Sequence, residues 1–193
     1  MQEFLKVDYM QPFLEKAIEL EALKFGDFTL KSGLKSSYFF DISEFFKNDA
    51  LKMLADLYVK KILEEEISFD AIFGPAYKGI PLASAVGISF FEKTGKKIDL
   101  VFDRKETKDH GEGGNIIGNL NQKKVLIIDD VLTAGTAIKN SLEVLKNENA
   151  SLAGVIVALD REEKNEKGVT YKNLLEINGI KIFSIANISD LNI

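Results

Sequence analysis

Apolar side chains recur with helical spacing in the first third of the chain. An amphipathic first helix is predicted by the spacing of Phe13, Ala17, Ile18 and the segment from Glu21 to Leu23. A second helix is predicted by apolar positions at i, i+3 and i+4 spacing, namely Leu51, Leu54, Ala55, Tyr58 and Ile62. Between these helices, residues 28–42 are rich in β-forming side chains. We therefore expect a small β-rich hood over approximately residues 25–45, completed by C-terminal elements.

From residue 69 onward, short apolar runs alternate with helical patterns. Helices are predicted over residues 80–91 and from the spacing of Ile138, Leu142 and Leu145. Strands are predicted at residues 69–73, 98–102, 125–128 and 152–159 and near 182–186. This alternation favours an α/β fold with a central parallel sheet, right-handed crossovers and flanking helices. No repeat or linker interrupts the pattern, so we expect a single domain over residues 1–193.

The segment from Val125 to Ala137, VLIIDDVLTAGTA, joins a buried strand to two acids and a turn of small residues. Asp129 and Asp130 are expected at the carboxyl end of the strand, where ligands of α/β sheets bind. They could accept hydrogen bonds from vicinal hydroxyls or help to hold a divalent metal. The turn that follows, together with the N-terminus of the next helix, could close around a phosphate. The pattern is typical of a sugar-phosphate site.

Two other interpretations of this segment remain. One is a strand that ends in a solvated acidic turn, with Thr136 capping the helix. The other is an acidic phospho-acceptor pocket of the flavodoxin-like kind. That pocket would need further acids at other strand ends, and the segment from Phe69 to Gly74 offers only Asp70, at the beginning of its strand.

A polar, glycine-rich loop follows the strand at residues 98–102. It runs from Asp103 to Asn121 and contains Arg104, Lys105, Lys108 and His110, interleaved with acids, and three glycines at 111, 113 and 114. A structureless loop of this length is uncommon within a domain and usually serves a function. We interpret residues 103–118 as a flexible lid; a solvated mixed-charge loop is the alternative.

Residues 73–80, FGPAYKGI, form a third loop at a strand end. Gly74 and Gly79 permit close backbone approach, and Lys78 could reach an anion. The competing interpretation is a helix N-terminus with an exposed lysine.

The amino-acid composition excludes several kinds of site and cellular environment. The 193 residues contain no cysteine and one histidine, which excludes thiolate chemistry, disulfides and multi-histidine metal sites. The net charge of −5 argues against a nucleic-acid-binding surface. We find neither a signal peptide nor an apolar run approaching the ~20 residues of a membrane span, and expect a soluble, cytoplasmic protein.

These segments together closely resemble the orotate phosphoribosyltransferases of the type found as a separate enzyme in bacteria, members of the type I phosphoribosyltransferase family. The resemblance extends from Phe25 to Glu162. The DDxxTxGT core is shared by phosphoribosyltransferases generally, whereas the YFF motif and the KDHGEGG loop are specific to the orotate enzymes. Further matching segments are FGDFTLKSGLKSSYFFD, FGPAYKGIPLA and LDRE.

The resemblance implies transfer of ribose 5-phosphate from 5-phosphoribosyl 1-diphosphate (PRPP) to N1 of orotate. The products are orotidine 5′-phosphate and diphosphate, in the de novo biosynthesis of UMP. Mg²⁺ is the implied cofactor, held mainly by PRPP and water near Asp129 and Asp130, with no direct protein ligand expected. The resemblance also implies a homodimer.

The resemblance assigns roles to individual residues. Asp129 and Asp130 would hold the ribose hydroxyls, and Tyr77 and Lys78 would meet the diphosphate, with Lys31 nearby. The 5′-phosphate would be cradled by Val131, Leu132, Thr133, Ala134, Gly135, Thr136 and Ala137. The lid would bring Arg104, Lys105, Lys108 and His110 to the diphosphate, with Arg104 and its neighbours reaching the partner subunit's site; Lys108 and His110 are expected to be catalytic together with the acidic pair.

The base site would use Phe39 and Phe40 against the orotate ring, a contact from Thr133, and Arg161 at the carboxylate. An aromatic face and a guanidinium fork suit a planar anion. The resemblance further predicts a cis peptide between Ala76 and Tyr77.

The chain departs from the family pattern in two places. Leu34 and Ser37 replace the usual arginine and proline, and the sequence DIS at residues 41–43 replaces NAG-like residues. We expect neither departure to touch a charged site residue. A purine salvage phosphoribosyltransferase and a PRPP-binding regulator of RNA or DNA remain as alternatives; Phe39, Phe40 and Arg161 speak against the first, and the acidic balance and complete lid against the second.

Overall fold

The computed structural model describes residues 10–29, 35–104 and 115–191. Within these ranges, six strands form a sheet in the order β5-β4-β3-β6-β7-β8, in which all neighbours are parallel except β5 and β4. The predicted, mostly parallel sheet is confirmed. Its strands are β3 (Ala71–Gly74), β4 (Asp99–Asp103), β5 (Ile116–Ile117), β6 (Lys124–Leu132), β7 (Ser151–Asp160) and β8 (Ile182–Asn187).

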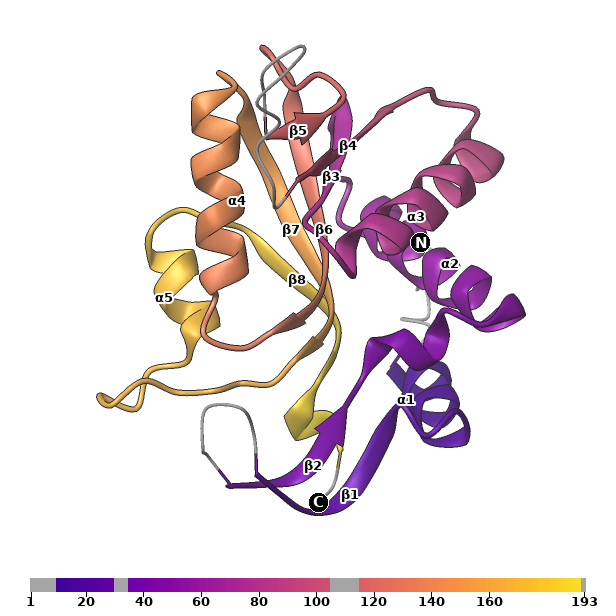
Figure 1. The fold of residues 1–193 in the computed structure, drawn as a ribbon, viewed down its shortest axis with the longest axis vertical. Helices are drawn as coiled ribbons and strands as arrows, with labels where there is room; N and C mark the ends of the chain where they lie inside the picture. Colours follow the sequence, from indigo (N-terminus) through magenta and orange to yellow (C-terminus); the bar gives the residue numbers. More distant parts are fainter. Residues whose placement is uncertain (1–9, 30–34, 105–114, 192–193) are drawn as a thin grey trace, which may run out of the picture.

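Helices cover both faces of this sheet. In Figure 1, α2 (Asn48–Glu64) and α3 (Gly79–Thr94) lie on one side, and α4 (Thr136–Asn147) and α5 (Tyr171–Ile177) on the other. The side chains of β6 divide accordingly. Leu126 and Ile128 join the apolar core beneath α2 and α3, whereas Val125 and Ile127 join the core beneath α4 and α5. The continuous apolar run of this strand is thus explained by burial on both faces.

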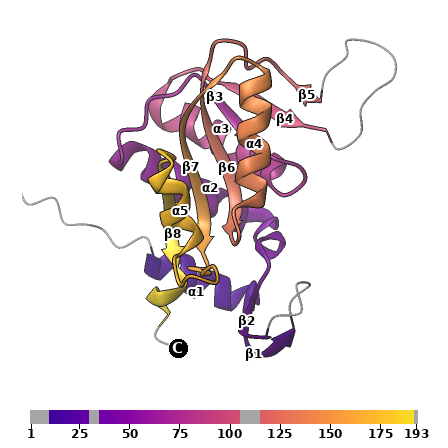
Figure 2. The ribbon, with the colours of Figure 1, turned by 90° about the vertical axis from the view of Figure 1, so that its left-hand side faces the viewer.

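A smaller unit, which we call the hood, lies at the carboxyl end of the sheet. It consists of α1 (Met10–Glu19), the antiparallel strands β1 (Leu23–Thr29) and β2 (Lys35–Phe40), and the 3₁₀ helix η1 (Ile42–Phe45). Figures 1 and 2 show it at the foot of the molecule, beside the last element, η2 (Ile188–Asp190). The ring of Phe13 ties the hood together, 6.0 Å from the Phe40 ring and 5.5 Å from the Phe45 ring.

Several predicted boundaries were wrong. The first helix ends at Glu19, and residues 21–23 leave it because Glu21 takes a positive φ of 56° and Leu23 begins β1. The loop predicted from Asp103 to Asn121 contains β5, whose Ile116 pairs with Asp103. The sequence patterns also missed α5, which spans only seven residues.

Among the described residues, no helix has both the length and the apolar character needed to span a bilayer.

Candidate active site

A cavity of about 410 Å³ opens at the carboxyl end of the sheet. Three segments supply its walls: the loop after β3, the end of β6 with the turn that follows, and the segment after β7. Phe40 of the hood also lines it. The lining residues are Phe40, Pro75, Ala76, Tyr77, Lys78, Asp129, Asp130, Val131, Thr133, Ala137 and Arg161. The structure therefore places predicted site residues that are far apart in the sequence, such as Phe40 and Arg161, around one cavity.

The acidic pair lies within β6. We predicted that this strand ends at Ile128, but it continues to Leu132 because Val131 and Leu132 still pair with β7. The neighbouring strand β3 pairs with β6 only as far as Ile127, so that side of the acidic pair is free of β3. The hydroxyl of Tyr58, from α2, donates to the backbone carbonyl of Asp129 at 2.7 Å. A fully buried tyrosine thus holds the strand where its sheet partner has ended.

The two carboxylates differ in their surroundings. Asp129 is buried, and its Oδ1 accepts the backbone N–H of Asp130 at 2.9 Å. Burial, followed by the charge of Asp130, raises the pKa of Asp129 well above its ordinary value of 3.8. Asp130 is more exposed and accepts the backbone N–H of Val131 at 2.9 Å. Both carboxylates are chemically able to accept hydrogen bonds from hydroxyl groups.

The turn after β6 is the segment where we predicted an anion site. Gly135 has a left-handed φ of 73° and immediately precedes α4, whose first residue is Thr136. The backbone conformation favours glycine, and a Cβ at Gly135 would meet Leu175 Cδ1 at 3.0 Å, so the leucine side chain would have to shift slightly. The N-terminal N–H groups of α4 therefore begin directly beside the acidic strand, where a phosphate is favoured. The side chain of Leu132 is buried in the core beneath α4, so only its backbone could contribute to the predicted phosphate turn.

The loop after β3 has an unusual backbone. The peptide between Ala76 and Tyr77 is cis, which confirms the prediction. The backbone N–H of Ala76 donates to Asp103 Oδ1 at 2.5 Å. A Cβ at Gly74 would come within 2.4 Å of the Gly79 carbonyl oxygen, so the loop folds back in close contact with its own start. Asp103, the last residue of β4, is a third acid at this end of the sheet that the sequence patterns did not single out.

Lys78 bridges the hood and the sheet. Its Nζ lies 2.8 Å from Asp41 Oδ1 and 3.5 Å from Asp130 Oδ2. Burial alone would raise the pKa of Asp41, but hydrogen bonds from Lys78 and Ser43 outweigh it and lower the pKa to about 2. We expected the DIS departure at residues 41–43 to touch no charged site residue, and that was wrong. The acid of this chain at position 41 directly pairs with a candidate diphosphate residue.

The aromatic and cationic residues of the predicted base site separate into two groups. Phe40 and Arg161 line the cavity, whereas Phe39 does not. Successive residues of a strand point to opposite faces, and Phe39 packs instead against Phe28, with ring centroids 5.7 Å apart. The predicted contact of Phe39 with the base therefore stays a prediction, whereas Phe40 already lines the cavity. Arg161 lies with its Cζ 4.5 Å from the centroid of the Tyr38 ring.

Other predicted residues lie outside the cavity or outside the described residues. Arg104 does not line the cavity; its backbone N–H donates to Asn115 O at 2.6 Å. Ala134 and Gly135 lie in the turn between β6 and α4, and Thr136 is the first residue of α4; none of the three lines the cavity. The remaining predicted residues, which lie outside the described residues, are Lys31, Lys105, Lys108 and His110, together with Leu34.

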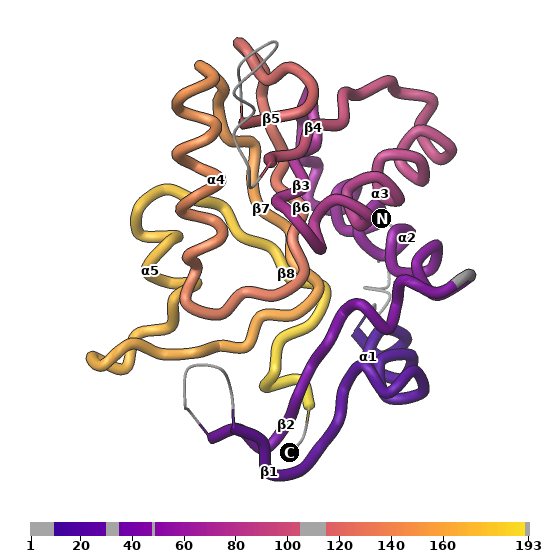
Figure 3. The backbone as a smooth tube through the Cα atoms, viewed as in Figure 1, coloured from indigo at the N-terminus to yellow at the C-terminus, as the bar shows by residue number. Residues whose placement is uncertain are grey.

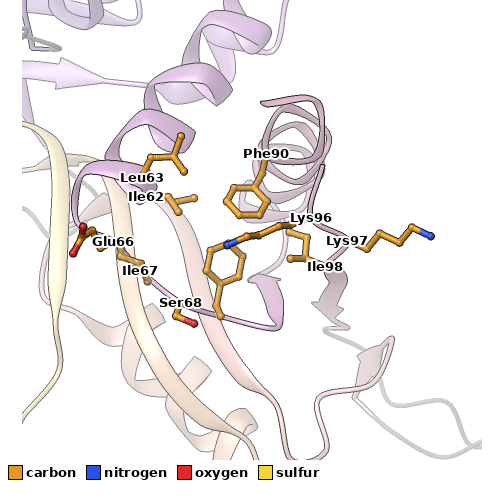
Figure 4. Close-up of a pocket in the computed structure, with 10 residues that line it drawn as sticks. Ile62, Leu63, Glu66, Ile67, Ser68, Phe90, Lys96, Lys97 and Ile98 are labelled. Atoms are coloured by element: carbon orange, nitrogen blue, oxygen red, sulfur yellow. The ribbon is translucent and has the colours of Figure 1, made fainter. Parts of the chain in front are cut away.

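A second cavity, of about 480 Å³, lies at the opposite end of the sheet. Figure 4 shows Ile62 and Leu63 of α2 facing Phe90 of α3 across it, while the side chain of Lys97 extends away. Its lining combines aliphatic and aromatic side chains with Glu66, Ser68, Lys96 and Lys97, and contains none of the predicted site residues. Across residues 10–29, 35–104 and 115–191, no group of three or more acids or histidines could hold a metal.

Comparison with known proteins agrees with this geometry. The model of the phosphoribosyl transferase domain family matches residues 41–187. An orotate phosphoribosyltransferase of Legionella pneumophila is 49% identical over 93% of this chain and 85% of its own length. One of Salmonella arizonae is 42% identical over 95% of this chain and 86% of its own length. The chain belongs to the orotate phosphoribosyltransferases.

A solved structure supports the same assignment. The orotate phosphoribosyltransferase of Francisella tularensis superimposes with a TM-score of 0.81 at 39% identity, covering 93% of this chain and 87% of that one. The predicted type I phosphoribosyltransferase fold is confirmed. The enzyme is a pentosyltransferase that converts orotate to orotidine 5′-phosphate with PRPP, in pyrimidine biosynthesis. Of the functions that the sequence left open, this one is shown.

Proposed function

We propose that the cavity at the carboxyl end of the sheet is where this orotate phosphoribosyltransferase binds PRPP and orotate together. One observation carries the proposal: Asp130, Lys78 and Arg161, which come from three distant segments, line a single cavity of about 410 Å³. Acceptors for hydroxyls, a cation for diphosphate and a guanidinium for a carboxylate thus surround one space. We further propose that residues 1–193 act as one phosphoribosyltransferase domain.

In this proposal PRPP lies along the floor of the cavity. Asp129 and Asp130 accept hydrogen bonds from the ribose hydroxyls, which suits two adjacent carboxylates at a strand end. The turn from Val131 to Ala137 and the N-terminus of α4 receive the 5′-phosphate. Tyr77 and Lys78 meet the diphosphate. The resemblance adds Lys31, Arg104, Lys105, Lys108 and His110 at the same group.

Orotate lies beneath the hood. Phe40 offers an apolar face to the ring, Thr133 contacts its polar edge, and Arg161 receives the carboxylate. The resemblance adds Phe39, whose ring lies 5.7 Å from that of Phe28 beside the cavity wall.

The chemistry follows from this arrangement. As the bond between C1 of the ribose and the diphosphate oxygen breaks, positive charge develops on the ribose ring and negative charge on the leaving group. Lys78 and the lid cations stabilise the leaving group, and the acidic pair fixes the ribose while N1 of orotate forms the new bond to C1. Closure over the site excludes water, which would otherwise intercept the sugar.

The residues present fit a magnesium ion held largely by substrate. Mg²⁺ commonly uses one or two carboxylates together with substrate phosphates and water. The described residues of the cavity offer two adjacent acids and no third ligand, which matches that mode. When bound, the ion supplies charge neutralisation at the diphosphate. Asp129 and Asp130 would hold its water shell.

We also propose a cytoplasmic homodimer in which lid residues serve the partner subunit's site, as the resemblance implies. Mixing Lys108→Ala and Asp130→Asn subunits should then raise the activity above that of either variant alone, because one of the two sites of a heterodimer keeps both residues. No recovery in a preparation shown to contain heterodimers would mean that Lys108 serves its own subunit's site or that no site is shared.

The experiment that tests the base site is Arg161→Ala, followed by measurement of both Michaelis constants. Loss of a charged hydrogen bond, worth about 1.5–3 kcal/mol, should raise the KM for orotate roughly tenfold or more and leave that for PRPP nearly unchanged. Equal increases in both constants would show that the base pocket has been misplaced.

A further inference from the structure

The guanidinium of Arg161 is enclosed on one edge. The side chain is 9% exposed, and Nε is inaccessible to solvent. Glu163 Oε1 lies 2.9 Å from Nε, at ion-pair distance, although the N–H is not aligned for a hydrogen bond to any described acceptor. An incoming anion cannot reach this edge. It can meet Arg161 only at the two terminal amino groups.

Two residues of β2 support the flat face and the end of the same group. The Tyr38 ring, itself buried, stacks against the guanidinium at 4.5 Å from Cζ. Ser36 Oγ accepts a hydrogen bond from Arg161 Nη2 at 3.4 Å, while its own proton is donated to the Tyr38 carbonyl. The hood thus limits the orientation of the guanidinium plane.

The backbone that carries Arg161 and Glu163 is fixed at both residues. The N–H of Arg161 donates to the Leu132 carbonyl at 3.1 Å, and the Glu163 carbonyl accepts from Tyr171 N at 3.0 Å. Figure 3 shows the chain after β7 running beside the connection from β6 to α4. The orientation of Arg161 is therefore set relative to the phosphate turn and the acidic strand.

We infer that Glu163 and Tyr38 are positioning residues for orotate: they hold Arg161 so that only its outer amino edge meets the carboxylate of the base. The inference rests on the proposed role of Arg161. Because Nε is enclosed, Glu163 does not compete with substrate for the same edge. Its carboxylate holds the inner edge, while Nη1 and Nη2, the latter also donating to Ser36, face outward and can bind the two oxygens of a planar carboxylate.

Glu163→Gln tests this inference, with Glu166→Gln as the matched control. Glu166 is an exposed acid on the same segment, so its substitution removes the same charge elsewhere. Glu163→Gln should raise the KM for orotate about three- to tenfold, as expected for one weakened hydrogen-bond network, and leave the KM for PRPP within about twofold. Glu166→Gln should change neither constant. An unchanged or lower KM for orotate in Glu163→Gln, or equal increases in both constants, would overturn the inference.

Tyr38 provides a second, independent test. Tyr38→Phe keeps the stacking face and should behave as wild type, whereas Tyr38→Leu should raise the KM for orotate selectively. Equal behaviour of the two variants would exclude positioning through the ring. Arg161→Ala separates the two levels of the argument. If it raises the KM for orotate while Glu163→Gln and Tyr38→Leu do not, only the present inference fails; if Arg161→Ala has no selective effect, the proposed base site fails with it.

Discussion

The two ends of the central sheet contain cavities of similar size, about 410 and 480 Å³, but their charged groups are used differently. At the amino end, Asp70 accepts the backbone N–H of Lys124 at 2.9 Å, and Asp99 forms an ion pair with Lys123. These acids already have cationic or N–H partners. They tie strands and loops together, and the neighbouring cavity is lined by apolar side chains together with Glu66, Lys96 and Lys97.

At the carboxyl end the acids lie against one another. Asp129 is buried beside Asp130, and its pKa is raised by that burial and by the neighbouring charge. Lys78 is shared between Asp41 and Asp130. Two adjacent carboxylates, one of them buried, lower the stability of the fold. Such an arrangement is typical of a functional site, where a bound ligand offsets this cost. The difference between the two ends indicates which cavity performs chemistry.

The largest expected effect on stability lies at the amino end. Phe90 is buried, and its ring lies 5.0 Å from that of Phe69. Phe90→Ala should lower the free energy of unfolding by about 3–5 kcal/mol through lost burial and a larger cavity. Urea denaturation measures this loss, and both Michaelis constants of the folded variant should remain unchanged. A large rise in either constant would contradict the separation of the two ends.

Asp130→Asn should produce the opposite outcome. The residue lies at the surface of the cavity, so folding should be nearly intact by circular dichroism. Loss of a charged acceptor should reduce kcat/KM for PRPP by about 1.5–3 kcal/mol of transition-state stabilisation, roughly ten- to a hundredfold. Near-normal activity would refute the role of the acidic pair.

Asp129→Asn should raise the stability of the protein while lowering its enzymatic activity. A carboxyl whose pKa is raised on folding destabilises the folded state above its ordinary pKa of 3.8, because the unfolded chain releases the proton more readily. The amide can still accept the Asp130 N–H. We expect the Tm at neutral pH to rise by about 2–4 °C, equivalent to roughly 1 kcal/mol. The gain should shrink as the pH falls toward 4, and a lower Tm at neutral pH would contradict the account.

Asp41→Asn should show the reverse pH dependence and a smaller effect. The pKa of Asp41 is lowered to about 2, so its charge contributes stability that is present above its ordinary value of 3.8 and lost as the pH falls toward 2. Partial exposure limits the contribution to about 0.2–1 kcal/mol at neutral pH. Thermal melts of wild type and variant should therefore converge in acid; a constant difference would mean that the Lys78 bridge is not responsible.

Sequence patterns predicted the elements whose burial is periodic or continuous. Apolar spacing alone predicts the first part of β6, the helix α2, and the alternation of strands and helices along the chain. The extension of β6 through Asp129 to Leu132 was not predictable in this way, because aspartate disfavours strands and pairing with β7 overrides that preference. The short strand β5 and the short helix α5 carry too few residues for a periodic signal.

In the candidate site, too, some residues could be predicted from the sequence and others could not. Asp129, Asp130, Lys78 and Arg161 belong to local motifs and could be identified along the sequence. Their supporting partners could not, because they come from distant segments: Tyr58 lies 71 positions from Asp129. Asp41 was visible only as a departure from the family pattern. Its contact with Lys78 depends on how the hood meets the sheet.

The central claim is that orotate and PRPP react at the acidic carboxyl end of the sheet. The most direct measurement follows orotate absorbance and diphosphate release together, with PRPP and Mg²⁺, for wild type and for the double variant Asp129→Ala/Asp130→Ala. We predict that wild type consumes orotate only with PRPP and releases diphosphate in equal amount, while the double variant, folded by circular dichroism, shows almost no turnover. Wild-type rates in the double variant, or turnover of adenine in place of orotate by wild type, would contradict the account.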